Sequence, residues 1–492
     1  MTRLSSRTVE ELRSEVRQPA YDRSKVTAGV VHLGVGAFHR AHQAVVFDDI
    51  LAAGDLRWGI RAASLRTADV HDQMMPQDGL YHLLVSDGAT TASQLIGSIL
   101  DVQVAPKNPA AIVAMLASVD THIVTLTVTE KGYKLDPVSG ALLKTDPQIA
   151  HELNSLSHPC SAPGFLVAAL AERRRKGIKP FTAISCDNIP SNGRRLQRAV
   201  IELAQAHDSL LARWIDEEGA FPDTMVDRIV PATIPQDIAA FASEYGLIDQ
   251  AMVKTEPFTQ WVIEDRFCGP RPTFPASVHL TSSVAPWEDA KLRLLNGAHS
   301  AIAYLGGLAG IAHVHETLSH SEFRIYVQQL WDEAETTLSP PAELDVATYR
   351  RALMARFDNS SLMHRTHQIA MDGSQKLPQR LLQSLVSRRS AGLPAPALTL
   401  GVAAWIRWHA GKDDLGRPHL VDDPLASELN VLFQTRTDPA GKVAAILNYP
   451  AIMPALLRDD PIFADALTSQ LINLETEGAM ASVRALTQGR GS

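Results

Sequence analysis

Hydrophobic and polar positions divide the chain into two halves with different patterns. Up to about residue 285, short apolar runs of strand length alternate with amphipathic segments of helical length. Such nearly continuous Val, Ile and Leu runs are typical of parallel strands that are buried on both faces. The runs occupy residues 29–36, 57–65, 82–87, 121–130, 181–188 and 227–233, and helical patterns cover 108–118, 164–176 and 192–216.

The order of these segments predicts the fold class. A strand at 29–36, a helix beginning near Phe38 and a strand at 57–65 form the opening βαβ unit of a doubly wound sheet. From about residue 286 the strand patterns stop, and helical patterns follow, separated by loops such as "LGRPHLVDDP". The sequence therefore predicts an α/β Rossmann-like domain over 1–285 and a mainly α-helical domain over 286–492. The cleft between two such domains is where we expect a ligand.

Composition and charge narrow the class of protein. The 492 residues are 45% hydrophobic and 20% charged, with a formal net charge of -8 and no basic cluster beyond "ERRRKGIK". This distribution does not favour a nucleic-acid partner. The most apolar long run, 301–314, is too short to span a membrane, and residues 1–25 lack the apolar centre of a secretory signal. We expect a cytoplasmic protein with no membrane partner, and the absence of an interface stripe favours a monomer.

The cysteines and histidines predict neither a disulfide framework nor a metal site. Cys160, Cys186 and Cys268 are odd in number, widely spaced and without a CxxC pattern. The run "HVHETLSH" contains a histidine cluster, but His313 and His315 would point to different faces of a helix. We therefore expect no bound metal.

A glycine turn follows the first predicted strand. In "HLGVGAFHRAHQ", Gly34 would permit a tight turn, and Gly36 would let the backbone approach a pyrophosphate at the start of the next helix. Phe38 and Arg40 belong to the same candidate cofactor-binding turn. His39 replaces the third glycine of the usual GxGxxG motif, so the turn alone is also compatible with a packing role.

The end of the second predicted strand bears on the choice of dinucleotide. In NAD-binding domains an acidic residue, about 20 residues after the glycine turn, takes the ribose hydroxyls of the adenosine. Asp69 in "SLRTAD" is the candidate for that role. Arg66 lies beside it and could instead receive the 2'-phosphate of NADP. The pattern favours NAD(H) and leaves NADP as the alternative.

Polar side chains share one face of a helix at the predicted domain junction. On an ideal helix, which turns by about 100° per residue, one arc contains Glu288, Lys291, Asn296 and His299 together with Leu292, Leu295 and Ile302. Gly297 and Ser300 would point to the other side. A buried ammonium is costly unless it has partners or a task. The helix alone is equally compatible with a surface lysine whose stem covers apolar neighbours.

Six motifs follow one another along nearly the whole chain: "GVGAFHRAHQ", "TVTEKGY", "SCDNIPSNG", "MVDRIVPAT", "KLRLLNGAHS" and "MDGSQKLP". Together they resemble the motifs of the mannitol dehydrogenase family of polyol-specific long-chain dehydrogenases. The family pattern of Lys, four residues, Asn, two residues and His falls on Lys291, Asn296 and His299. The resemblance implies a Rossmann-like domain followed by a helical domain, a nicotinamide cofactor and no metal.

The resemblance also implies roles in hydride transfer. Lys291 would be the general acid and base. Partial desolvation would lower its pKa from about 10.4 toward the working pH. Asn188 and Asn296 would stabilise the charge that develops on the substrate oxygen. The remaining expected roles are orientation of substrate hydroxyls by His299 and Asp227 and proton transfer to water by Glu288. Asn188 and Asp227 are also compatible with simple turn positions at strand ends.

Two branches of the family compete for the substrate. Polyol members commonly read TEGGY where this chain reads "TEKGY" at 129–133, and they tend to have an arginine where this chain has Gln368. Both differences resemble the hexuronate reductases. A substrate carboxylate needs a cation, and the candidates are Lys131, Arg365, Lys376 and Arg380, of which Lys376 matches a family substrate lysine.

We therefore expect an NAD(H)-dependent reductase of the fructuronate type, which interconverts D-fructuronate and D-mannonate. The alternative within the family is a mannitol 2-dehydrogenase or a related arabinitol or sorbitol dehydrogenase. From another class, a catalytically silent dinucleotide-binding protein would need no proton carrier. The presence of Lys291, Asn296 and His299 argues against that class.

Overall fold

The computed structural model describes residues 2–12, 14–136, 139–436 and 438–488. The chain forms two compact units, Met1–Ala285 and Pro286–Ser492. Within the described residues, none of the helices combines the length and the apolar character that a membrane span requires.

The first unit is built on a five-stranded parallel sheet with the strand order β6-β3-β2-β7-β8. Its strands are β2 (Val30–Leu33), β3 (Ile60–Ser64), β6 (Ile99–Val104), β7 (Ile123–Leu126) and β8 (Thr182–Ser185). The chain enters at β2, adds β3 and β6 on one side, and then returns to add β7 and β8 on the other. The order therefore reverses between β2 and β7, which is the switch point where open α/β sheets bind ligands.

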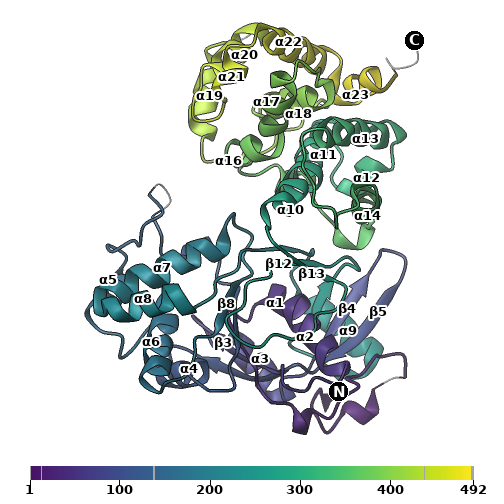
Figure 1. Ribbon diagram of the computed structural model, residues 1–492. Coiled ribbons are helices and arrows are strands. Elements are labelled where there is room, and N and C mark those ends of the chain that lie inside the picture. Colours follow the sequence, from purple (N-terminus) through teal and green to yellow (C-terminus); the bar gives the residue numbers. More distant parts are fainter. Residues whose placement is uncertain (1, 13, 137–138, 437, 489–492) are drawn as a thin grey trace. The chain divides into compact units, whose positions relative to one another are not determined.

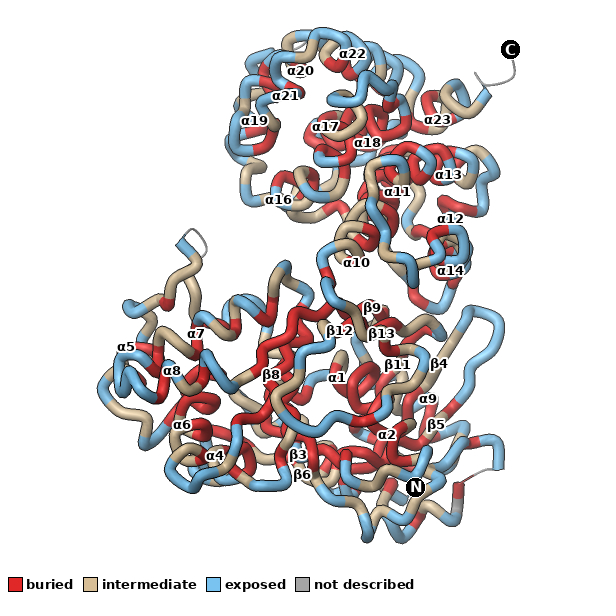
Figure 2. The backbone as a smooth tube through the Cα atoms, in the orientation of Figure 1, coloured by how far each residue is buried: buried red, intermediate tan, exposed pale blue. Residues whose placement is uncertain are grey.

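Helices cover both faces of this sheet, because successive side chains of a strand point to opposite faces. Val31 and Leu33 pack in one apolar cluster with the helices α4 (Pro109–Leu116), α6 (Ala162–Arg175), α7 (Asn192–His207) and α8 (Ser209–Glu218). Val30 packs in a second cluster with α1 (Ala37–Ala41) and α2 (Gln43–Ala52). Figure 1 shows the strands between these two helical layers, and Figure 2 shows them as buried. The predicted doubly wound sheet is confirmed.

Two predicted strands differ from the observed ones. The run at 82–87 forms β4 (Tyr81–Ser86), which pairs with β5 (Thr91–Ile96) and β11 (Val253–Thr255) in a separate sheet. The strand predicted at 227–233 is wrong, because β9 (Thr224–Asp227) ends where it was expected to begin. Pro231 and Pro235 follow it and cannot donate to a sheet. β9 pairs with β12 (Gln260–Glu264), which pairs with β13 (Val278–Thr281).

The helix predicted over 192–216 is two helices. Asp208 separates α7 from α8, because its side chain caps the second helix by accepting the N–H of Leu210 at 2.8 Å. The unit is completed by α3 (Asp69–Met74), α5 (Pro147–Asn154), α9 (Pro235–Tyr245) and the short pair β1 (Thr2–Arg3) and β10 (Leu247–Ile248).

The second unit is built from helices, as predicted. Its centre is α11 (Gly297–Leu308), which packs on α18 (Pro396–Trp408), and both are buried along most of their length. The other helices are α10 (Ala285–Ala290), α12 (Val314–Leu318), α13 (Ser321–Glu335), α14 (Val346–Asp358), α15 (Thr366–Ile369), α16 (Gly373–Leu377), α17 (Gln383–Ser390), α19 (Ala426–Gln434), α20 (Pro439–Leu447), α21 (Ala455–Arg458), α22 (Pro461–Thr476) and α23 (Gly478–Gln488).

Two π-helical segments interrupt helices of the second unit. The first, η5 (Lys291–Asn296), joins α10 to α11, and the second, η7 (Pro378–Leu382), joins α16 to α17. The π-helix bonds residue i to residue i+5, is rare, and is frequent at functional sites. The ideal α-helix expected around Lys291 is therefore wrong between residues 291 and 296.

Candidate active site

The glycine turn lies at the carboxyl end of β2, at the switch point of the sheet. Gly34 has a φ of 97°, and a Cβ there would lie 2.2 Å from the carbonyl oxygen of Thr127, so no other residue fits without a shift. The hydroxyl of Thr127 donates to the carbonyl of Gly34 at 2.6 Å, which ties the turn to β7. A Cβ at Gly36 would have no atom nearer than 3.9 Å, so a ligand can approach the backbone there.

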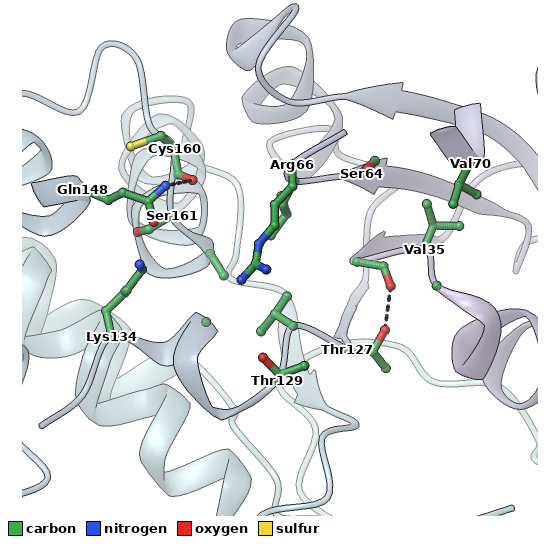
Figure 3. Close-up of a pocket in the computed structure, with 16 residues that line it drawn as sticks. Val35, Ser64, Arg66, Val70, Thr127, Thr129, Lys134, Gln148, Cys160 and Ser161 are labelled. Carbon is green, nitrogen blue, oxygen red and sulfur yellow. Dashed lines mark hydrogen bonds between the residues drawn. The ribbon is translucent and has the colours of Figure 1, made fainter. Parts of the chain in front are cut away.

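A cavity of about 290 Å³ opens beside this turn. It follows the carboxyl ends of β2, β3 and β7 (Figure 3). The side chain of Arg66 extends into it from the loop after β3, toward the space between Thr129 and Lys134. Further lining residues include Val35, Gly36, Ser64, Leu65, Val70, Val128, Gly132, Gln148, Cys160 and Ser161. An open glycine backbone on one wall and polar groups opposite fit a dinucleotide.

The expected cofactor residues reach this cavity only in part. Gly34, Gly36 and Arg66 line it. Asp69 lies outside its lining and is exposed at the start of α3, where it accepts a hydrogen bond from the hydroxyl of Thr67 at 2.9 Å. The structure thus places the arginine, rather than the neighbouring carboxylate, in the cavity wall.

The side chains of α1 pack inside the first unit. The ring of Phe38 stacks on His42 with 5.2 Å between centroids. Arg40 is buried, and burial lowers the pKa of its guanidinium. The hydroxyl of Tyr81 donates to the carbonyl of Arg40 at 2.7 Å. Neither Phe38 nor Arg40 belongs to the cavity lining, so their cofactor roles stay predictions.

Asn188 and Asp227 lie at the carboxyl ends of two segments that are tied together. The side-chain amide of Asn192 donates to the carbonyls of Asp187 and Thr224, both at 2.9 Å, and its oxygen accepts the N–H of Thr224 at 2.9 Å. These bonds hold the end of β8 against β9. Asn188 is exposed and Asp227 is buried.

The sequence does not predict a buried network that lies beside the cavity. The carboxylate of Asp187 accepts the N–H groups of Val128 at 3.1 Å and Thr129 at 2.8 Å, and the hydroxyl of Tyr133 at 2.7 Å. Burial raises the pKa of this carboxyl. The network fixes the loop after β7, in which Thr129 has a φ of 66° that is unusual for a β-branched residue. The motifs "TEKGY" and "SCDN" contain these residues, but nothing in the sequence pairs them.

Lys291 begins the π-helical segment η5 and is buried, with 7% of its surface exposed. Because π-helical bonding matches residues five apart, Asn296 comes one turn from Lys291 on the same side of the segment. His299 follows in α11, and Glu288 precedes in α10. The four expected residues therefore occupy one continuous helical stretch. Lys291 and Asn296 align more closely on one side of it than they would on an ideal α-helix.

The opposite side of this stretch is covered by the second π-helical segment. Gly297 and Ser300, which were expected on the other side from the polar group, are both buried. A Cβ at Gly297 would lie 2.8 Å from the carbonyl oxygen of Arg380, and Nη1 of Arg380 donates to the hydroxyl of Ser300 at 3.0 Å. The side that carries Gly297 and Ser300 therefore packs against η7.

His299 lies among aromatic rings. Its centroid is 4.6 Å from that of Phe357 and 5.6 Å from that of His364. Burial, and then the nearby charges of other groups including Arg380, hold the pKa of His299 well below its usual value. The imidazole is therefore neutral at pH 7 and can both donate and accept. Its Nε2 has no hydrogen-bond partner among the described residues, which leaves this atom for a ligand hydroxyl.

The side chains expected near a substrate carboxylate differ in burial. The exposed ones are Lys131, Arg365 and Gln368. Lys376 is partly buried, donates from Nζ to the carbonyl of Met371 at 2.6 Å, and lies 3.4 Å from the carboxylate of Asp372. Burial, and then the charge of Arg380, lower the pKa of Lys376.

The histidine cluster at the start of α12 differs from its expected geometry. The rings of His313 and His315 stack 5.5 Å apart, because His313 precedes the helix as its N-cap. Nδ1 of His313 lies 3.1 Å from the carboxylate of Glu316. Across the described part of the chain, no group of three or more His, Cys, Asp or Glu side chains could hold a metal ion.

Comparison with known proteins gives consistent matches over the whole chain. Residues 28–276 match the mannitol dehydrogenase Rossmann domain, and residues 283–475 match the mannitol dehydrogenase C-terminal domain. The D-mannonate oxidoreductase of Escherichia coli (strain K12) is 40% identical over 486 residues, which cover 97% of this chain and 100% of the relative. A mannitol 2-dehydrogenase of Pyrenophora tritici-repentis is 38% identical over 490 residues, which cover 98% and 85%. The structure of Pseudomonas fluorescens mannitol 2-dehydrogenase in a ternary complex with NAD and D-mannitol matches with a TM-score of 0.81 and 34% identity, covering 99% of both chains.

Proposed function

The chain belongs to the mannitol dehydrogenase family and is an oxidoreductase, and from this premise we propose that it interconverts D-fructuronate and D-mannonate with NAD(H). The observation that carries the proposal is the pair of partly buried cations, Lys376 and Arg380, on the segment that packs against the Lys291 helix. Lys376 matches a substrate lysine of the family as a whole, but a neutral polyol gives no reason to add a second cation, Arg380, on the same segment, whereas a sugar acid does. The similarity to a D-mannonate oxidoreductase supports the same substrate.

The cavity beside the glycine turn is the proposed site of NAD(H). When bound, the dinucleotide supplies the hydride to the keto carbon or accepts it from the carbinol carbon. Gly34 permits the tight turn, and Gly36 leaves the backbone open for the pyrophosphate. Arg66 lies in the cavity wall and is the side chain that would contact a 2'-phosphate, so NADPH is the necessary control cofactor.

Lys291 is the proposed proton carrier at the reacting oxygen. During reduction its ammonium gives a proton to the carbonyl oxygen, and during oxidation the neutral amine takes it back. The amide groups of Asn296 and Asn188 donate hydrogen bonds to that oxygen as negative charge develops on it. A lysine in this position performs the proton transfer without a metal ion.

Three further side chains complete the proposed substrate site. The neutral imidazole of His299 and the carboxylate of Asp227 orient substrate hydroxyls, since both can accept a hydrogen bond. Glu288 stands one helical turn before Lys291 and passes the proton between Lys291 and water. Lys376 attracts the acid end of the substrate.

The alternative within the family is a polyol dehydrogenase, which oxidises mannitol or a related sugar alcohol. The relatives that are named mannitol 2-dehydrogenase favour it. Both alternatives use Lys291 in the same way, so they differ only in what binds the far end of the substrate.

The experiment that separates them is NADH oxidation, followed by absorbance, with D-fructuronate and D-fructose offered in parallel and NADPH as the cofactor control. The proposal predicts turnover with fructuronate and NADH at a kcat/KM far above that with fructose. Turnover with fructose alone would contradict the sugar-acid proposal and favour the polyol alternative.

A further inference from the structure

Arg380 is a partly buried cation of the second unit. It lies in the π-helical segment η7, and burial lowers the pKa of its guanidinium. Among the described residues its single hydrogen-bond partner is the hydroxyl of Ser300, which accepts from Nη1 at 3.0 Å. No carboxylate of the described residues lies within ion-pair distance of it. Partial burial of a guanidinium without an ion-pair partner is costly unless an anion binds to it.

The other cations of the second unit that could meet a substrate carboxylate differ from Arg380. Arg365 is exposed, and water already solvates its charge. Lys376 has Asp372 at 3.4 Å and the carbonyl of Met371 at 2.6 Å, so its charge is compensated within its own loop. The nearby carboxylate of Asp423 accepts the N–H groups of Ser374 and Leu425. Of the two partly buried cations, Arg380 therefore has the weaker compensation, since Asp372 attracts it only from beyond ion-pair distance.

The position of Arg380 relative to the candidate substrate residues is fixed by packing. Its carbonyl oxygen lies against Gly297, two residues before His299, and its Nη1 bonds to Ser300, one residue after His299. Its charge is near enough to depress the pKa of both His299 and Lys376. An anion on Arg380 would thus lie next to the helical turn that carries His299, whose Nε2 has no partner among the described residues.

We propose that Arg380 is the residue that binds the carboxylate of the sugar-acid substrate and so sets the preference for acids over neutral ketoses. Nη1 is held by Ser300, which leaves Nε and Nη2 as a parallel pair of donors for the two carboxylate oxygens. Ser300 orients the guanidinium, and Lys376 adds a second, weaker attraction. This assignment rests on the proposed function, because it names the group that recognises the acid end of that substrate.

The test is the ratio of kcat/KM for D-fructuronate to kcat/KM for D-fructose in the wild type, Arg380→Gln and Arg380→Lys. Loss of a buried charge pair lowers the ratio by about 30-fold or more in Arg380→Gln. Arg380→Lys keeps the charge without the paired donors, so part of the preference returns. An equal loss for both substrates in Arg380→Gln would overturn the assignment, since a merely structural role lowers both.

Arg388→Gln is the matched control, because Arg388 lies on α17, which continues from η7, and its guanidinium is satisfied by Pro394 and Thr336. It leaves the ratio unchanged. A Ser300→Ala variant, which frees the guanidinium without removing it, keeps the acid preference and broadens the range of acids accepted.

A separate measurement distinguishes failure of this assignment from failure of the proposed function. If the wild type reduces fructose and not fructuronate, the proposed function fails, and inhibition by D-gluconate is then compared with inhibition by its neutral counterpart, sorbitol. Stronger inhibition by gluconate in the wild type, lost in Arg380→Gln, would still support an acid site at Arg380. Equal inhibition by the two compounds would overturn it.

Discussion

The glycine turn of the first unit and the Lys291 helix of the second unit hold their functional groups in different ways. The turn offers backbone, and its shape follows from two neighbouring parallel strands and one close contact between Gly34 and Thr127. The Lys291 helix offers side chains, and their spacing depends on π-helical bonding and on the segment η7 that packs behind it. Both sites thus depend on a contact with a distant part of the chain, but the first presents main-chain groups and the second presents side chains.

Among the glycine variants, the largest effect should come from breaking the backbone site with Gly34→Ala. The added methyl meets the Thr127 carbonyl at 2.2 Å at a positive φ. We expect a loss of about 2–4 kcal/mol in the free energy of unfolding and NADH binding weakened by about tenfold or more. Urea denaturation and NADH fluorescence titration measure the two effects.

Gly54→Ala is the matched control for that variant. Gly54 has a φ of 100° and no atom within 4 Å of an added Cβ, so it carries the same backbone strain without the contact. We expect it to cost about 1 kcal/mol and to leave NADH binding intact. Equal NADH affinity in the two variants would remove the glycine turn from the cofactor site.

A smaller effect should come from disturbing the side-chain site with Gly297→Ala. The methyl would lie 2.8 Å from the Arg380 carbonyl and would push the two π-helical segments apart. We expect kcat to fall by about tenfold, because small displacements of a proton carrier are costly, while NADH affinity stays unchanged. Gly307→Ala, in the same helix, presses on Trp408 at 2.7 Å and serves as the control. If both variants lowered kcat equally, the contact between the π-helical segments would have no special role.

The smallest effect concerns the pH dependence of stability. Both units contain buried histidines whose rings are neutral. Burial lowers the pKa of His32 to about 3 in the first unit, and of His364 and His409 to about 4 in the second. Between about pH 6.5 and pH 4 the unfolded chain therefore binds protons that the folded chain does not. The free energy of unfolding falls as the pH is lowered through this window, by at most about 1.4 kcal/mol per pH unit for each histidine.

His409→Phe isolates one of these contributions, because the ring of His409 lies against Trp405 and Phe433. Urea denaturation gives the free energy of unfolding at pH 7 and at pH 5. The fall in this free energy between the two pH values should be about 2 kcal/mol smaller in the variant than in the wild type. An unchanged difference would mean that His409 is protonated in the folded protein.

Much of the fold could be predicted from the sequence, because buried parallel strands consist of runs of apolar residues. The strand β6 escaped prediction since it lies at the sheet edge and carries Asp101 and Gln103 among its apolar residues. The residues of the Lys291 helix were found from their spacing, but η5 was not, because no residue in it signals a π-helix. For η7 a signal existed: Pro378 begins it and lacks the N–H that an α-helix needs. The network of Asp187 and the contact of Arg380 with Gly297 join residues far apart in the chain, which no local pattern encodes.

The central claim is that the dinucleotide is bound by the first unit and that Lys291, in the second, carries the proton. Lys291→Ala tests it most directly, with NADH binding followed by fluorescence and turnover by absorbance on the same sample. The account predicts unchanged NADH affinity and a kcat lower by about 10³-fold or more. Turnover close to that of the wild type would contradict the account, because the proton would then be carried by another group.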